Sequence, residues 1–193
     1  VVTGGTHPLP QVSIPCVTWE ELLVVSNAPP PHRIIDGDMA AILYTSGSTG
    51  KPKGVVLSHR NMVSGAKSVA LYLENRASDR ILTVLPFSFD YGLSQLTTAF
   101  WKGACAVLLN YLMPRDVLVA VERERITGLA AVPPRWIQLA QLDWPERVTS
   151  YLRYITSSGG AMPSAVVKSL RAKLPKTKIF LMYGLTEAFR STY

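Results

Sequence analysis

The sequence predicts an α/β fold in which a mostly parallel sheet is flanked by helices. From residue 39 onward, apolar runs of strand length alternate with segments of helical periodicity. Only 17% of the 193 residues are charged and 48% are hydrophobic, as expected when strands are buried on both faces. A repeated strand–helix–strand order favours right-handed crossovers and places ligands beyond the carboxyl ends of the strands.

Six short apolar runs, bounded by polar or turn-forming residues, are expected to form the strands. They are residues 40–44, 81–85, 105–109, 128–132, 151–156 and 178–182. The clearest helix begins after Ser58, whose hydroxyl can cap it. The apolar residues that share one face of this helix are Met62, Ala66, Val69 and Leu73.

Two more helices are expected further along the chain. Residues 114–125 form one of them, with Val117 and Val121 directed inward and the charges outward. Pro163 suits the first turn of the other, which runs to Lys173.

The chain divides by pattern into an irregular lead-in over residues 1–37 and an α/β region over residues 38–193. The lead-in contains a candidate short helix at residues 19–25 and a proline-rich loop after it. The chain does not begin with Met, and its high hydrophobic content also fits a piece cut from a larger protein. We therefore expect part of a longer chain.

The net charge of +7 has its source between residues 147 and 186, where no acidic residue occurs. The basic residues of this stretch are Arg147, Arg153, Lys168, Arg171, Lys173, Lys176 and Lys178. A solvated helix face explains them better than nucleic-acid binding, because charge alone supplies no groups that read bases. We therefore expect no nucleic-acid partner.

The two cysteines, Cys16 and Cys105, make neither a disulfide framework nor a metal site. Cys105 lies in an apolar run and is expected to be buried as a small hydrophobe. This cysteine usage favours a reducing cytoplasm. No apolar run reaches the length of a membrane span, so we expect none.

A loop rich in glycine, hydroxyl and lysine side chains follows the first expected strand. Its sequence over residues 44–54 is YTSGSTGKPKG. The glycines let consecutive N–H groups converge on an anion, while the hydroxyls and lysines add donors and positive charge. The residues expected to hold a polyphosphate are Thr45, Ser46, Gly47, Ser48, Thr49, Gly50, Lys51 and Lys53.

This loop is not a Walker A loop, because two residues rather than four separate Gly47 from Gly50 and Pro52 follows Lys51. A flexible Gly/Ser linker is the plain alternative, but the loop stands between an apolar strand and a capped helix. The segment closely resembles the signature of the adenylate-forming (AMP-binding) superfamily, which includes acyl-CoA synthetases, luciferases and amino-acid adenylation domains. The resemblance implies ATP or AMP as the ligand, with Lys53 among the catalytic residues.

A second segment, SSGGA at residues 157–161, keeps the order and spacing of that superfamily. The resemblance implies that Gly159, Gly160 and Ala161 pack against the adenine and border the acyl pocket. Glycine suits this role because a flat base needs close approach to the backbone. Taken alone, the segment is equally an ordinary turn between a strand and a helix.

A third segment, YGLTE at residues 183–187, matches another motif of the superfamily. The resemblance implies that Tyr183 and Gly184 contact the nucleotide and that Thr186 acts at the α-phosphate. It also implies that Glu187 is a catalytic residue and the Mg²⁺ ligand, which fits the preference of Mg²⁺ for carboxylate and phosphate oxygens.

Phe89 and Asp90 lie in the segment that corresponds to the acyl pocket of the superfamily. Many acyl-CoA ligases carry His where this chain has Phe89. The run Ser88-Phe89-Asp90 is more similar to amino-acid adenylation domains, whose Asp pairs with the substrate amine. Asp90 is equally suited to cap the helix expected near residues 92–101, and both roles can coexist. Val132 begins a segment that resembles the loop lining the same pocket.

The resemblance implies a fragment of the large N-terminal domain of an acyl-CoA synthetase or ligase-like enzyme. The parent would use MgATP to activate a small-molecule carboxylate as acyl-adenylate, and would pass it to CoA, another thiol or a carrier protein. The alternatives are a fragment of an amino-acid adenylation domain and a nucleotide-binding module without catalysis. Superfamily members supply a ribose-binding Asp and a mobile domain with a catalytic Lys after the third motif. We therefore expect the fragment, truncated at its C-terminus, to be inactive alone.

Overall fold

The structure is a computed structural model, and the residues that it describes are 2–3, 17–18, 21, 23–24, 33–46 and 50–189. The chain forms two compact units, Val1–Ile34 and Ile35–Tyr193. In the first unit, β1 (Val2–Thr3) and β2 (Val17–Thr18) pair in parallel. The helix expected at residues 19–25 lies largely outside the described residues.

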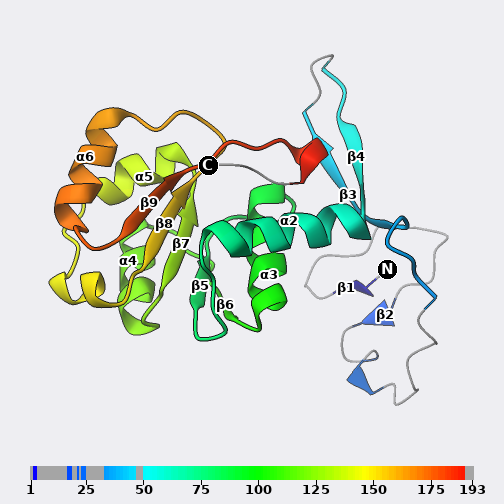
Figure 1. The fold of residues 1–193 in the computed structure, drawn as a ribbon, viewed down its shortest axis with the longest axis horizontal. Coiled ribbons are helices and arrows are strands. Elements are labelled where there is room, and N and C mark those ends of the chain that lie inside the picture. The colour runs from blue at the N-terminus through cyan, green and yellow to red at the C-terminus, as the bar shows by residue number, and fades with distance from the viewer. Residues whose placement is uncertain are drawn as a thin grey trace. The chain divides into compact units, whose positions relative to one another are not determined.

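The second unit contains a five-stranded, fully parallel sheet, which confirms the predicted fold class (Figure 1). Its strands, in spatial order, are β6 (Cys105–Leu108), β5 (Arg80–Thr83), β7 (Gly128–Ala131), β8 (Tyr154–Ser157) and β9 (Lys178–Leu181). The chain adds β6 on one side of β5 and then adds β7 on the other side. Parallel α/β sheets bind ligands beyond the carboxyl ends of the strands at such a switch point.

Helices cover both faces of this sheet (Figure 1). They are α2 (His59–Tyr72), α3 (Asp90–Lys102), α4 (Pro114–Arg123), α5 (Pro133–Ala140) and α6 (Ser164–Lys173). The face with Leu82, Leu129 and Ile155 packs against α4, α5 and α6 in the main core. The opposite face, with Ala130 and Tyr154, packs against α2 and α3. None of the helices in the described part of the chain is long and apolar enough to cross a membrane.

Local sequence signals account for the helix boundaries. The Ser58 hydroxyl accepts a hydrogen bond from the Asn61 N–H at 3.2 Å, and the Asn61 side chain accepts one from the Ser58 N–H, which confirms the predicted cap of α2. Pro163 precedes α6 directly, close to its expected place. Helix α5 is missing from the sequence-based prediction, although its two initial prolines, Pro133 and Pro134, are favourable in a first helical turn.

Burial follows position in the sheet. The central strands β7 and β8 are buried at every residue, whereas the edge strands β6 and β9 have exposed ends. Cys105 begins β6 and is exposed. The prediction of a buried Cys105 is therefore wrong, because an apolar run on an edge strand is covered less completely than one at the centre.

The strand expected at residues 40–44 is confirmed as β3 (Met39–Thr45), but it lies outside the parallel sheet. It pairs antiparallel with β4 (Lys53–Ser58), a strand that the sequence analysis did not predict. The short connection between them explains this pairing, because parallel neighbours need a crossover of about a dozen residues or more. The glycine-rich loop is consequently the tip of a hairpin, and Thr45 lies opposite Lys53 in the register.

A buried polar network ties together the amino ends of the parallel strands. At its centre, the Asp79 side chain is 2% exposed. One of its oxygens accepts hydrogen bonds from the Asn75 amide and the Arg76 N–H, and the other accepts one from the Thr127 hydroxyl at 2.9 Å. The Arg153 guanidinium pairs with both oxygens at 3.3 Å. The segments preceding β5, β7 and β8 are therefore linked at the edge opposite to their carboxyl ends.

Tyr154, beside this network, should make the stability of the protein fall at high pH. Burial raises the pKa of its phenol above the usual range, and the Asp79 carboxylate adds to this shift, against a hydrogen bond from the Asn75 amide. Above the unfolded pKa of about 10, the unfolded state loses a proton that the folded state retains, so unfolding becomes easier as pH rises. Urea unfolding between pH 8 and 11 should show this decline. Tyr154→Phe should flatten it, and equal slopes would contradict the assignment.

Candidate functional site

A cavity of about 240 Å³ opens where several segments leave the carboxyl ends of strands. Its walls come from the end of β3, the start of α3, the turn after β8 and the segment after β9. The lining residues are Thr45, Phe89, Asp90, Tyr91, Ser158, Gly159, Gly184, Leu185, Thr186 and Glu187. The structure therefore brings together residues from all three motifs and from the expected acyl-pocket segment.

The glycine-rich loop reaches this cavity through Thr45, the last residue of β3. Lys53 begins the returning strand, and the Lys51 and Lys53 side chains are exposed, as are Ser46 and Gly50. The other expected loop residues, Gly47, Ser48 and Thr49, lie outside the described residues. Lys53 lies opposite Thr45 in the hairpin, so its exposed ammonium group is available to neutralise an anionic ligand near Thr45.

The third motif is held against the hairpin by a buried anchor. Thr186 and Glu187 belong to the short 3₁₀ helix η2 (Thr186–Ala188), and Phe189 follows it directly. The Phe189 side chain is fully buried and packs with Leu43 and Leu57 of the hairpin. This contact places Thr186 and Glu187 beside the strand end that carries Thr45.

The turn after β8 approaches its neighbours closely at Gly159. The backbone of Gly159 has φ +81°, a conformation that side chains disfavour. A Cβ atom at Gly159 would lie 3.6 Å from Val132 and 3.8 Å from the Phe89 ring, so these two side chains border the turn. Gly160 and Ala161 are exposed and do not line the cavity.

Asp90 is a buried carboxylate in the cavity wall and is 6% exposed. It is the first residue of α3, whose cap is Phe89, and no side-chain cap hydrogen bond forms. The alternative in which Asp90 caps this helix is therefore wrong, because Asp90 lies one residue inside it. Within the described part of the chain, no residue forms a hydrogen bond or ion pair with its carboxylate, so a ligand in the cavity can be its partner.

The candidate site residues chosen from the sequence leave out three residues of the cavity and include several that do not line it. Ser158, Tyr91 and Leu185 line the cavity, each directly beside a residue that the motifs had indicated. Ser158 and Leu185 lie inside the second and third motifs, and Tyr91 follows Asp90 directly, so these positions were the available signal. Tyr183 is 70% exposed and does not line the cavity, although its open ring can still stack on a base outside it.

The cavity fits a magnesium ion only together with a phosphate ligand. The structure shows no group of three or more metal-ligating side chains in the part of the chain that it describes. Glu187 supplies one carboxylate beside the Thr186 hydroxyl. Mg²⁺ is commonly held by one or two carboxylates plus substrate phosphates and water, and this donor set meets that requirement.

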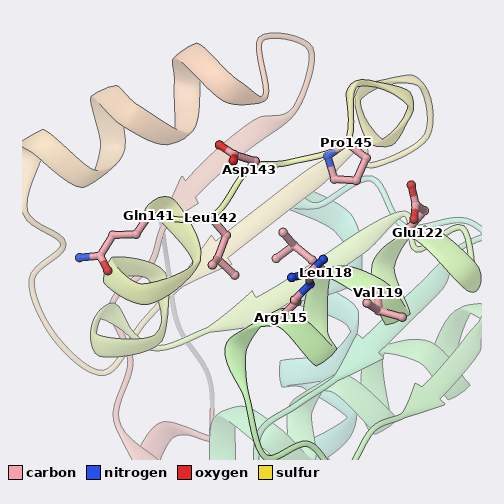
Figure 2. A pocket seen from close by; sticks show the side chains of 8 residues that line it. All are labelled: Arg115, Leu118, Val119, Glu122, Gln141, Leu142, Asp143 and Pro145. Atoms are coloured by element: carbon pink, nitrogen blue, oxygen red, sulfur yellow. The ribbon is translucent and has the colours of Figure 1, made fainter.

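A second cavity, of about 340 Å³, lies between α4 and the segment after α5, as Figure 2 shows. Leu118 and Glu122 line it from α4, and Leu142 and Pro145 line it from the other side. None of its lining residues belongs to a motif, and none directly follows a strand. This cavity is therefore not the expected nucleotide site.

Comparison with known families identifies the family of the chain. The profile of the family described as AMP-binding enzyme matches residues 7–192, almost the whole chain. The chain belongs to the AMP-binding enzyme family. This result confirms the resemblance inferred from the three motifs, and the fold agrees with it. The cavity between Thr45, Gly159 and Glu187 is the candidate nucleotide site of this family member.

Relatives of this AMP-binding chain include two kinds of named protein. 4-coumarate–CoA ligase 2 of Oryza sativa subsp. japonica is 36% identical over 181 residues, which cover 90% of this chain and 32% of the ligase. Bacitracin synthase 3 of Bacillus licheniformis is 35% identical over 163 residues, 81% of this chain and 2% of the synthase. The chain therefore spans about a third of the CoA ligase and a small part of the synthase.

A solved structure of similar fold is O-succinylbenzoate coenzyme A synthetase from Bacillus subtilis, in complex with ATP and magnesium ion. It matches with a TM-score of 0.76 and 30% identity, over 92% of this chain and 37% of that chain. The presence of ATP and magnesium in that complex fits the donor set of the cavity described above.

Proposed function

We propose that this chain is part of an AMP-forming ligase that activates a carboxylate as acyl-adenylate and transfers the acyl group to the thiol of CoA. The observation that carries the proposal is the single cavity in which Thr45, Gly159, Thr186 and Glu187 meet Phe89. Residues 38–193 form the ATP/AMP-binding region in this proposal. The 36% identity to a CoA ligase, in an alignment that covers 90% of this chain, favours CoA as the acceptor. The cysteine usage favours a cytoplasmic location.

The first step joins the carboxylate to the nucleotide. A carboxylate oxygen attacks the α-phosphorus of ATP, and pyrophosphate leaves with the electrons of the broken P–O bond. The exposed Lys51 and Lys53 and the hydroxyls of the loop bind the β- and γ-phosphates, while the Thr186 hydroxyl donates to the α-phosphate. A Mg²⁺ ion held by Glu187 would offset the charge that builds on the phosphate oxygens.

The acyl end of the substrate lies against the turn after β8 in this proposal. Phe89 and Val132 border Gly159 there and exclude water from the reacting carboxylate. In the second step, the thiolate of CoA attacks the acyl carbonyl carbon, and AMP leaves with the electrons of the broken C–O bond. The exposed ring of Tyr183 stacks on the adenine.

The test is ATP–pyrophosphate exchange by the full-length protein with a panel of aromatic acids, fatty acids and amino acids. We expect exchange with at least one aromatic or fatty acid, and formation of its CoA thioester when CoA is added. ATP binding without exchange for any acid would instead support a nucleotide-binding module without catalysis.

Amino-acid adenylation is the second candidate, and the buried Asp90 carboxylate favours it. Asp90 lines the cavity without a cap hydrogen bond and could pair with a substrate ammonium group. Asp90→Asn separates the two candidates. If the substrate carries an amine, the variant should lose about 10-fold or more in kcat/KM, as for a charge-assisted hydrogen bond. For an aromatic or fatty acid, the same change should alter kcat/KM by less than about 3-fold.

A further inference from the structure

A buried hydrogen bond joins two walls of the candidate nucleotide cavity. The Tyr91 hydroxyl lies 2.5 Å from the Thr156 hydroxyl, across 65 positions of sequence, and both side chains are at most 2% exposed. Tyr91 belongs to the first turn of α3, next to Phe89 and Asp90. Thr156 lies in β8, just before Ser158 and the turn at Gly159. The bond therefore connects the acyl-side wall to the turn that faces it.

The strand side of this bond is held rigidly. The Trp136 indole N–H donates to the Thr156 carbonyl oxygen at 3.0 Å and to the Ala131 carbonyl oxygen at 3.1 Å. Trp136 is fully buried in the main core, on the opposite face of the sheet from Tyr91. Thr156 is consequently fixed from both faces, through its backbone and through its side chain.

The position of the first turn of α3 depends more strongly on the Tyr91–Thr156 hydrogen bond than the position of β8 does. Helix α3 starts without a side-chain cap hydrogen bond at Phe89, so its first turn lacks the usual local restraint. Gly92 packs against the backbone of Pro86, which blocks movement of the turn in that direction. In this first turn, the Tyr91 side chain hydrogen-bonds to the sheet at Thr156.

We propose that Tyr91 and Thr156 are positioning residues that set the spacing between the Phe89–Asp90 wall and the turn at Gly159. This inference rests on the proposed function, because the spacing defines where the carboxylate lies relative to the α-phosphate. Loss of the bond lets the start of α3 at Phe89 and Asp90 move, while the phosphate side keeps its anchor at Phe189, against which Leu93 further along α3 also packs. The effect therefore falls on the carboxylate substrate rather than on ATP.

Tyr91→Phe and Thr156→Val in the full-length protein test the proposal by kinetics. Because misplacement by 1 Å can cost about 100-fold in rate, we expect kcat/KM for the carboxylate to fall about 10-fold in each variant. KM for ATP should change less than about 2-fold, and the double variant should be no worse than either single one. Thr156→Ser, which keeps the hydroxyl, should restore most of the activity.

Thr83→Val is the matched control. Thr83 is also buried near the end of a parallel strand, and its hydroxyl donates to the Val107 carbonyl, away from the cavity. Its kinetics should stay near those of the wild type. Equal losses in Thr83→Val and Tyr91→Phe, or additive losses in the double variant, would overturn the positioning role.

Hydrogen exchange gives a readout that needs no catalysis. In Tyr91→Phe, amides at residues 89–93 should exchange several-fold faster than in the wild type, while those of β5 should not change. Unchanged exchange at residues 89–93 would refute the proposed restraint. If the wild type shows no ATP–pyrophosphate exchange with any carboxylate, the proposed function fails, and the amide measurement still decides whether the bond restrains the cavity wall.

Discussion

Replacing Asp79 with alanine is expected to lower the free energy of unfolding by about 3–5 kcal/mol, as when one partner of a buried ion pair is removed. The Arg153 side chain, which is largely buried, would lose its carboxylate partner. The Asn75 amide and the Thr127 hydroxyl would lose an acceptor at the same time. These groups precede or flank three strands, so the effect should reach the whole parallel sheet.

Urea unfolding followed by circular dichroism measures this loss as a shift of the midpoint. Asp79→Asn keeps one acceptor oxygen and should therefore lose less stability than Asp79→Ala. Asp143→Ala is the control, because Asp143 is exposed and has no recorded ion pair within the described part of the chain. It should change stability by less than about 0.5 kcal/mol. Similar midpoints for Asp79→Ala and Asp143→Ala would show that the network contributes little.

Replacing Gly92 with alanine should cost about 3 kcal/mol or more, at the upper end for overpacking of a tight site. A Cβ atom at this position would lie 2.1 Å from the Pro86 carbonyl oxygen and 2.9 Å from that of Leu85. Both atoms belong to the backbone, so no side-chain rotation relieves the clash. Helix α3 must shift, and with it Phe89 and Asp90 in the cavity wall.

The control for Gly92→Ala is Gly37→Ala, because a Cβ atom at Gly37 meets no atom within 4 Å. Gly37→Ala should leave the unfolding midpoint nearly unchanged. Gly92→Ala should lower it and also reduce ATP–pyrophosphate exchange in the full-length protein. A Gly92→Ala protein with wild-type stability would mean that the backbone at Leu85 and Pro86 moves away from the added Cβ atom at little cost in free energy.

The structure gives acidic partners to three of the seven basic residues in the stretch that the sequence analysis interpreted as solvated. Arg147 pairs with Glu122, which lowers the pKa of that carboxyl through a hydrogen bond. Arg153 belongs to the Asp79 network, and Lys178 pairs with Glu74. Acidic partners distant in sequence therefore offset part of the charge of a segment that has no acidic residue of its own.

Features that depend on neighbouring residues could be predicted from the sequence. The five parallel strands are short apolar runs, and burial of such runs follows from their composition. The start of α2 is set by Ser58 and Asn61, three positions apart. The motif residues Thr45, Gly159, Thr186 and Glu187 were identified by type and order, and all four line one cavity.

Only the tertiary structure decided which distant segments meet. Composition does not reveal that residues 39–45 pair with β4 rather than enter the parallel sheet, nor that Cys105 lies on an edge strand. The Tyr91–Thr156 hydrogen bond joins residues 65 positions apart. Phe189 brings η2 to the hairpin through core packing. Local propensity and motif spacing act over a few residues, whereas the cavity depends on close packing between segments that the whole fold brings together.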